Sequence, residues 1–159
     1  LAEAVKSGEI DTISTDHCSY TLAQKAMGRG DFSRIPNGLP GIEHRPIAIL
    51  GSFWGALPAP ALARLLAGNA ARLYGMYPKK GAIREGSDAD LAVYDPDACT
   101  VISAKTQHMK TDYNPYEGMT LKGAVRDVLL MGDHVVQKGR LVGTPKGSYL
   151  LRKAVDVSL

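Results

Sequence analysis

A carboxylate and an imidazole stand side by side at the end of a short β-branched segment. Residues 10–15 are rich in Ile and Thr, which favours an extended strand, and Asp16 and His17 follow directly. A carboxylate in this place can ligate a metal, take up a proton as a general base, or cap the next helix. Because adjacent residues of a strand point to opposite faces, Asp16 is the candidate ligand and His17 is its neighbour.

The other histidines do not group as a catalytic metal requires. His44, His108 and His134 are far apart, and the sequence has neither a His-x-His nor a His-Glu-x-x-His pattern. A catalytic zinc needs about three protein ligands, so these residues alone are not expected to hold one. We expect the three histidines to be surface or structural residues. The sequence also has no Gly-x-Ser-x-Gly elbow and no phosphate-binding glycine loop.

Composition excludes several function classes. The chain has 159 residues, of which 45% are hydrophobic and 22% charged, as in ordinary globular proteins. Its net charge of +3 comes without a Lys/Arg cluster, so nucleic acid is not an expected partner. No apolar run is long enough to span a membrane. Cys18 and Cys99 form no Cys-x-x-Cys pattern, which favours a reducing, cytoplasmic location.

The first part of the chain has the pattern of an α/β unit. A helix over residues 1–7 is stopped by Gly8, and the strand over residues 10–15 follows. The carboxyl end of a parallel strand is the usual place for chemistry in α/β folds. Residues 28–41 are rich in Gly and Pro and predict a long irregular loop. A helix is expected over residues 61–74, with one apolar face formed by Leu62, Leu65, Leu66 and Leu73.

The second part predicts short strands. Strands are expected over residues 81–86 and 90–94, the second ended by Asp95-Pro96-Asp97. Residues 125–131 and 134–137 flank Gly132-Asp133 as a hairpin, and residues 139–142 continue the ladder. Together they indicate an antiparallel sheet or sandwich. Residues 113–118 predict a packed turn with buried aromatic side chains.

Several of these stretches resemble one enzyme family. Residues 8–18 resemble the last barrel strand of cyclic amidohydrolases. Ile35-Pro36-Asn37-Gly38, with residues 40–45 and 112–118, resembles loops of the D-hydantoinase and dihydropyrimidinase family. Residues 69–75 and 81–95 are similar to the final barrel helix and to the return into the small β domain. Ser19-Tyr20 and Ala70 depart from the family pattern, which has Pro-Phe and Pro there, so the substrate stays open.

The resemblance implies an α/β fold: the C-terminal portion of a metal-dependent hydrolase TIM (β/α)8 barrel, followed by the C-terminal part of a small β-sandwich. Residues 1–76 would be the last strand, loop and helices of the barrel, residues 77–143 the sandwich, and residues 144–159 a tail. A TIM barrel takes about 250 residues. The sequence, which also lacks an initiator Met, is therefore expected to be a fragment.

The resemblance also implies an activity, hydrolysis of the cyclic amide bond of dihydropyrimidines or hydantoins. Asp16 would be both metal ligand and proton shuttle, the Asn37 backbone would bind the substrate ring, and His17 would support Asp16. Two zinc ions and a homotetramer are implied for the full-length enzyme. This chain supplies one ligand and is expected to be inactive alone.

Three alternatives remain from the sequence. One is a non-catalytic dihydropyrimidinase-like structural protein. Another is a hydrolase of the allantoinase or dihydroorotase type. The third is a free-standing β domain, which the leading helix and strand disfavour.

Overall fold

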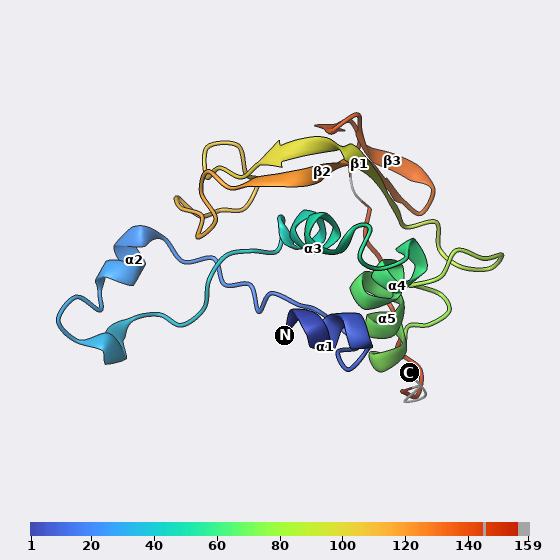
Figure 1. The fold of residues 1–159 in the computed structure, drawn as a ribbon, viewed down its shortest axis with the longest axis horizontal. Helices are drawn as coiled ribbons and strands as arrows, with labels where there is room; N and C mark the ends of the chain where they lie inside the picture. The colour runs from blue at the N-terminus through green and yellow to red at the C-terminus, as the bar shows by residue number, and fades with distance from the viewer. Residues whose placement is uncertain (145, 156–159) are drawn as a thin grey trace.

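A computed structural model describes residues 1–144 and 146–155. Its elements, in chain order, are α1 (Ala2–Ser7), α2 (Leu22–Ala26), η1 (Phe32–Arg34), α3 (Arg45–Phe53), α4 (Ala59–Ala63), η2 (Arg64–Gly68), α5 (Asn69–Leu73), β1 (Leu91–Val101), β2 (Thr120–Leu130), β3 (Asp133–Gln137) and β4 (Arg140–Leu141). Figure 1 shows the sheet on one side, α3 beneath it, and α1, α4 and α5 below α3. No helix within the described residues is long and apolar enough to cross a bilayer. The fold is α/β, as expected.

The first helix ends as the sequence predicts, but the strand after it does not form. Gly8 closes α1 in a left-handed conformation with φ 82°. Residues 9–16 have no regular secondary structure, which corrects the expected strand over residues 10–15. A strand needs a hydrogen-bonded neighbour, and none of the described strands lies beside this segment. Side chains of two helices bind its carbonyls instead: Arg45 donates to Ile13 O at 2.5 Å and Asn69 donates to Asp11 O at 2.9 Å.

The helical core forms around one long helix. α4, η2 and α5 run continuously from Ala59 to Leu73, which confirms the helix expected over residues 61–74. Leu62 and Leu65 are buried and pack with residues of α1 and α3, namely Val5 and Phe53. Leu73 is 39% exposed, so its expected place on the buried face is wrong. The middle of this helix, η2, is a π-helical turn.

Two expectations about the strands are corrected. Residues 81–86 form bends and turns, and Ile83 is 89% exposed. β1 does not end at Asp95 but continues to Val101 through a bulge, where the pairing with β2 shifts between Asp95 and Cys99. Pro96 lies in this bulge, where the ladder does not require an N–H donor.

The four strands form an antiparallel meander in the order β1-β2-β3-β4. The β2–β3 hairpin is confirmed, with its turn one residue earlier than expected. Met131 and Gly132 have φ 54° and 89°, as a two-residue type I′ turn requires. Lys138 and Gly139, with φ 51° and 73°, make an equivalent turn before β4, so the ladder expected over residues 139–142 is confirmed for Arg140 and Leu141 while Gly139 belongs to the turn.

A glycine lets α3 approach the sheet closely. The sequence pattern did not predict α3, which packs against β2. A Cβ on Gly51 would lie 2.7 Å from the Lys122 carbonyl oxygen. Only glycine allows this contact, and the contact sets the distance between α3 and the sheet.

The tail is described in part. Residue 145 and residues 156–159 of the tail expected over residues 144–159 lie outside the described residues. Residues 146–155 contain no helix or strand, and Lys153 N donates to Gly75 O at 2.8 Å. This hydrogen bond places the tail beside the end of α5 (Figure 1).

A charged cluster ties the start of β1 to the β2–β3 hairpin. Asp90 accepts hydrogen bonds from the Lys80 ammonium and, at 2.9 Å, from Met131 N–H. Burial raises the pKa of Asp90, but these two hydrogen bonds outweigh burial and hold the pKa below its ordinary value of 3.8. The hydrogen bond to Asp90 in turn raises the pKa of Lys80.

We expect this cluster to make the sheet acid-sensitive. A lowered carboxyl pKa contributes stability above the ordinary pKa, and that contribution is lost as the pH falls through the folded value. The free energy of unfolding, measured with urea, should fall as the pH is lowered from 5 to 2. Asp90→Asn should make this fall smaller, by less than about 1 kcal/mol. Asp133→Asn is the control, since Asp133 is exposed. An equal effect of both substitutions would contradict the role of Asp90.

Candidate active site

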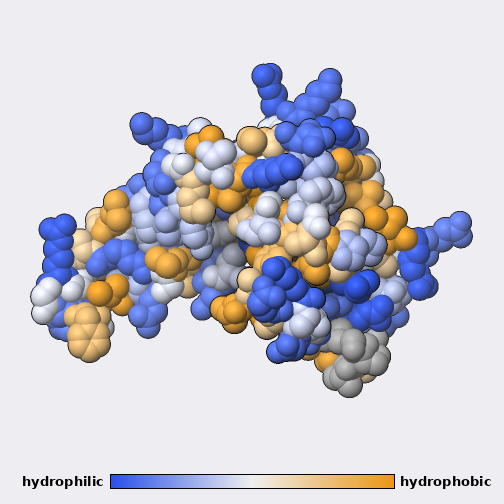
Figure 2. Space-filling model, in the orientation of Figure 1, coloured by the Kyte–Doolittle hydropathy of each residue, from blue (hydrophilic) through white to orange (hydrophobic). Residues whose placement is uncertain are grey.

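The two segments with sequence-predicted site residues lie side by side. His17 and Leu39 form a parallel bridge, and Cys18 N donates to Leu39 O at 3.1 Å. Residues 19–40, called the arm here, leave the body of the molecule and return to it, carrying α2 and η1 at their far end (Figure 1). Figure 2 shows the arm as the extension on the left of the molecule. The return of the arm brings the loop of Asn37 next to Asp16 and His17.

Asp16 combines an unusual backbone with an uncommitted side chain. Its φ is 44°, a left-handed conformation that Asp tolerates better than most residues but that still costs about 1–3 kcal/mol. The residue is exposed, and within residues 1–144 and 146–155 no hydrogen bond or ion pair is made by its carboxylate. Both oxygens are therefore open to a ligand, and a carboxylate of this kind suits a divalent cation.

Asp16 is a single ligand. No group of three His, Cys, Asp or Glu side chains that could hold a metal occurs within the described residues. A metal at Asp16 would need further ligands from outside the described residues.

His17 is engaged through both ring nitrogens. Its Nδ1 accepts from Gly41 N–H at 3.1 Å, so the neutral ring carries its proton on Nε2. Nε2 is 2.8 Å from Ser19 Oγ and donates to it. With both nitrogens occupied, the imidazole holds the returning arm against residues 17–19. Ser19, one of the departures from the family pattern, is the group that completes this arrangement.

Two contacts in the arm were missed by sequence reasoning. Gly38 has φ 98°, and a Cβ there would overlap Cys18 Sγ and lie 2.6 Å from Cys18 Cβ. Lys25 of α2 donates from Nζ to the carbonyls of Pro36 and Gly38, on either side of Asn37. Neither contact follows a local pattern, because each joins residues that only the folded arm brings together.

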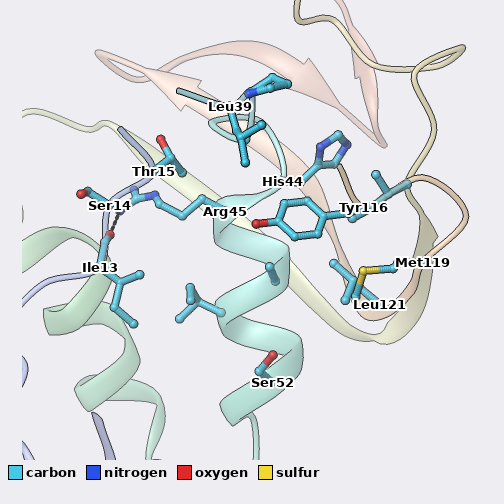
Figure 3. Close-up of a pocket in the computed structure, with 15 residues that line it drawn as sticks. Ile13, Ser14, Thr15, Leu39, His44, Arg45, Ser52, Tyr116, Met119 and Leu121 are labelled. Atoms are coloured by element: carbon cyan, nitrogen blue, oxygen red, sulfur yellow. Dashed lines mark hydrogen bonds between the residues drawn. The ribbon is translucent and has the colours of Figure 1, made fainter. Parts of the chain in front are cut away.

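A cavity of about 350 Å³ lies on another side of residues 13–15. It is bounded by that segment, by α3, and by residues around Tyr116 and Met119 (Figure 3). Arg45 reaches from α3 across its edge to Ile13 O. The cavity is lined mostly by apolar side chains and by none of Asp16, His17 or Asn37, so it is distinct from the candidate site.

The remaining histidine contacts are structural, as expected for His44 and His108. His44 is buried, and its Nδ1 lies 3.2 Å from Asn114 Nδ2. Glu43 accepts from His108 Nδ1 at 2.9 Å and from the backbone of His108 and Met109. Burial raises the Glu43 pKa, but these hydrogen bonds outweigh burial and hold the pKa below its ordinary value. The ionised Glu43 thus fastens residues 108–109 to the start of α3.

The turn over residues 113–118 is packed in part as expected. Tyr113 is half-buried with its hydroxyl shielded from solvent, Asn114 is buried, and Tyr116 is 46% exposed. Asn114 Nδ2 donates to Gln107 Oε1 at 2.8 Å, and Asn114 Oδ1 accepts from Tyr116 N–H at 2.9 Å. The expectation of buried aromatic side chains is confirmed for Tyr113 and wrong for Tyr116, and the Asn114 amide adds contacts to His44, Gln107 and the turn itself.

The sequence and structure match known enzymes. Residues 1–142 match the model of the amidohydrolase family. The chain is 43% identical over 157 residues to a D-hydantoinase of Geobacillus stearothermophilus, covering 96% of this chain and 33% of that protein. It is 43% identical over 145 residues to a D-hydantoinase of Streptomyces coelicolor, covering 90% of this chain and 31% of that protein.

Solved structures agree. A D-hydantoinase crystal structure superposes with a TM-score of 0.90 at 42% identity, over 95% of this chain and 34% of that one. An L-hydantoinase (dihydropyrimidinase) of Arthrobacter aurescens superposes with a TM-score of 0.78 at 32% identity, over 89% of this chain and 32% of that one.

The chain thus spans about a third of the length of these relatives. The resemblance to D-hydantoinases and dihydropyrimidinases is confirmed. The chain belongs to the amidohydrolase family.

Proposed function

We propose that this chain supplies part of the active site of a metal-dependent hydrolase that opens cyclic amides of the hydantoin or dihydropyrimidine type. The observation that supports it is the uncommitted carboxylate of Asp16 beside the loop of Asn37, in a chain whose relatives are named D-hydantoinase. In this proposal residues 1–76 are the last strand, loop and helices of the barrel, and residues 10–15, which pair with no strand of the described residues, would pair with a neighbouring strand of the full-length enzyme. Residues 77–143 belong to the β-sandwich, and residues 144–159 are the tail.

Asp16 has two roles in the proposed reaction. A bound metal centre, for which we propose two zinc ions, would polarise the amide carbonyl as a Lewis acid and lower the pKa of water. The Asp16 carboxylate would be one ligand of that centre. It also takes the proton of the attacking water at an oxygen and returns it to the leaving nitrogen of the ring. Its exposed, unpaired state is what both roles require.

Asn37 positions the substrate ring, and His17 positions the Asn37 loop. A hydantoin or dihydropyrimidine ring presents N–H and C=O groups alternately along one edge. The backbone N–H and C=O of Asn37 can pair with that edge in either register. His17 holds the return of the arm through Gly41 N–H and so keeps the Asn37 loop beside Asp16.

The alternatives are less well supported. A non-catalytic dihydropyrimidinase-like protein gives no reason for a strained and unpaired Asp16. Allantoinase and dihydroorotase activities remain second to that of the hydantoinases named among the relatives. We further propose a small cyclic amide as the partner, a homotetramer as the assembly, and the cytoplasm as the location.

A chimera tests the proposed function. This chain would replace the matched segment of the Geobacillus stearothermophilus D-hydantoinase, which it covers at 33% of the length. We expect the purified chimera to hydrolyse hydantoin or dihydrouracil, followed by loss of ring absorbance. The 159-residue chain alone should show no turnover, because it offers one candidate ligand for a centre that needs about three. A folded chimera without hydrolysis of either ring would contradict the proposal.

A further inference from the structure

Lys25 is a charged side chain that contacts the Asn37 loop. It belongs to α2, which begins with a capping box: Thr21 accepts from Gln24 N–H, and the Gln24 side chain accepts from Thr21 N–H. Lys25 is half-buried, and its Nζ lies 5.4 Å from the centre of the Tyr20 ring. The capped helix and the aromatic ring hold the ammonium at one position in the arm.

From that position the ammonium binds two carbonyls. Nζ donates to Gly38 O at 2.5 Å and to Pro36 O. These oxygens belong to the peptide groups immediately before and after the one that joins Asn37 to Gly38. Hydrogen bonds from a charged donor are stronger than those between neutral groups, so both peptide planes are firmly oriented.

Because the peptide bond is planar, the two hydrogen bonds of Lys25 also fix the orientation of the Asn37 backbone. In a trans peptide the N–H points opposite to the C=O. When Pro36 C=O faces Lys25, Asn37 N–H faces away from it. The peptide between Asn37 and Gly38 lies between two fixed planes, and Gly38 adopts the φ of 98° that this arrangement needs.

We propose that Lys25 is the positioning residue of the substrate-binding loop: by holding the carbonyls on either side of Asn37, it sets the direction in which the Asn37 N–H and C=O meet the ring of the substrate. The inference rests on the proposed function of Asn37. Lys25 itself touches neither the substrate nor the reacting atoms in this account.

The test uses Lys25→Met in the full-length chimera, with Lys25→Arg and Arg29→Met beside it. Methionine keeps the length and helix propensity of lysine but donates no hydrogen bond. Arginine keeps the charge and can donate to both carbonyls. Arg29 is an exposed cation of the same arm, so its replacement controls for charge alone.

We expect Lys25→Met to raise KM about tenfold with kcat nearly unchanged, because uniform binding of the ring is lost. Lys25→Arg should restore KM to within about threefold, and Arg29→Met should leave it unchanged. An unchanged KM, a loss confined to kcat, or an equal effect of Arg29→Met would overturn the proposal.

Hydrogen exchange separates this inference from the proposed function. The amides of Cys18 and Gly41 bond to groups across the returning arm. They should exchange faster in Lys25→Met, while those of α1 should not change. This readout holds even in a chimera without activity, which would count against the proposed function alone. Unchanged exchange at Cys18 and Gly41 would overturn the role of Lys25.

Discussion

Asp16→Asn in the chimera is expected to lower kcat by about a thousandfold or more. Asparagine has nearly the shape of aspartate, but at neutral pH its amide cannot take up the proton of the attacking water. It is also a poorer ligand for a divalent cation, so the metal content measured by plasma emission should fall with kcat. Thermal unfolding of the metal-free chimera should change little, because the carboxylate makes no hydrogen bond or ion pair with the described residues.

Two further variants distinguish the effect of the Asp16 carboxylate from that of the backbone conformation of Asp16. Asp16→Gly adopts the observed φ of 44° without strain, so it should lose activity while the metal-free protein stays at least as stable. Asp11→Asn is the matched control, an exposed aspartate of the same segment, and should keep normal kcat. Near-normal turnover by Asp16→Asn would show that Asp16 is only a structural residue.

The elements predicted well from sequence are those with their own local signals. Gly8 stops α1, and the leucines around Leu62 mark the long helix. The Gly after Met131 gives the hairpin its turn. Each signal acts within a few residues, so it holds whatever the rest of the chain does.

The failures arise where a distant partner decides the structure. Residues 10–15 have the composition of a strand, but no strand of the described residues lies beside them, and their carbonyls bind Arg45 and Asn69 instead. Residues 81–86 similarly remain bends and turns. β1 continues beyond Asp95-Pro96-Asp97, where the sequence predicts its end, because β2 pairs with β1 on both sides of the bulge. β propensity describes fit to a neighbour, and the sequence pattern does not tell whether a neighbour is present.

The residues of the candidate site also differ in whether the sequence predicts them. Asp16 follows from its place after a β-branched segment, whereas Asn37 follows only from the resemblance to hydantoinases. Lys25 and the contact of Gly38 with Cys18 depend on how the arm folds back. His17 contacts Ser19 and Gly41 through its ring nitrogens, and its support of Asp16 stays a prediction.

The contact of Gly38 with Cys18 makes the Asn37 loop sensitive to a single methyl group. Gly38→Ala should lower kcat/KM of the chimera about a hundredfold, equivalent to about 2.7 kcal/mol. A Cβ at this position would lie 2.6 Å from Cys18 Cβ, which real contacts do not allow. The φ of 98° adds strain for any residue but glycine. The loop must therefore move away from residues 16–18, and Asn37 moves with it.

Gly30→Ala separates the steric contact from the strain. Gly30 lies in the same arm with φ 83°, and a Cβ there would have no atom within 4 Å. It carries the same kind of backbone penalty without the overlap, so kcat/KM should fall by less than about threefold. Steady-state kinetics of both variants, with thermal midpoints to verify folding, give the comparison. If the two alanine variants lost activity equally, the Cys18 contact would have no part in placing Asn37, because strain alone would account for the loss.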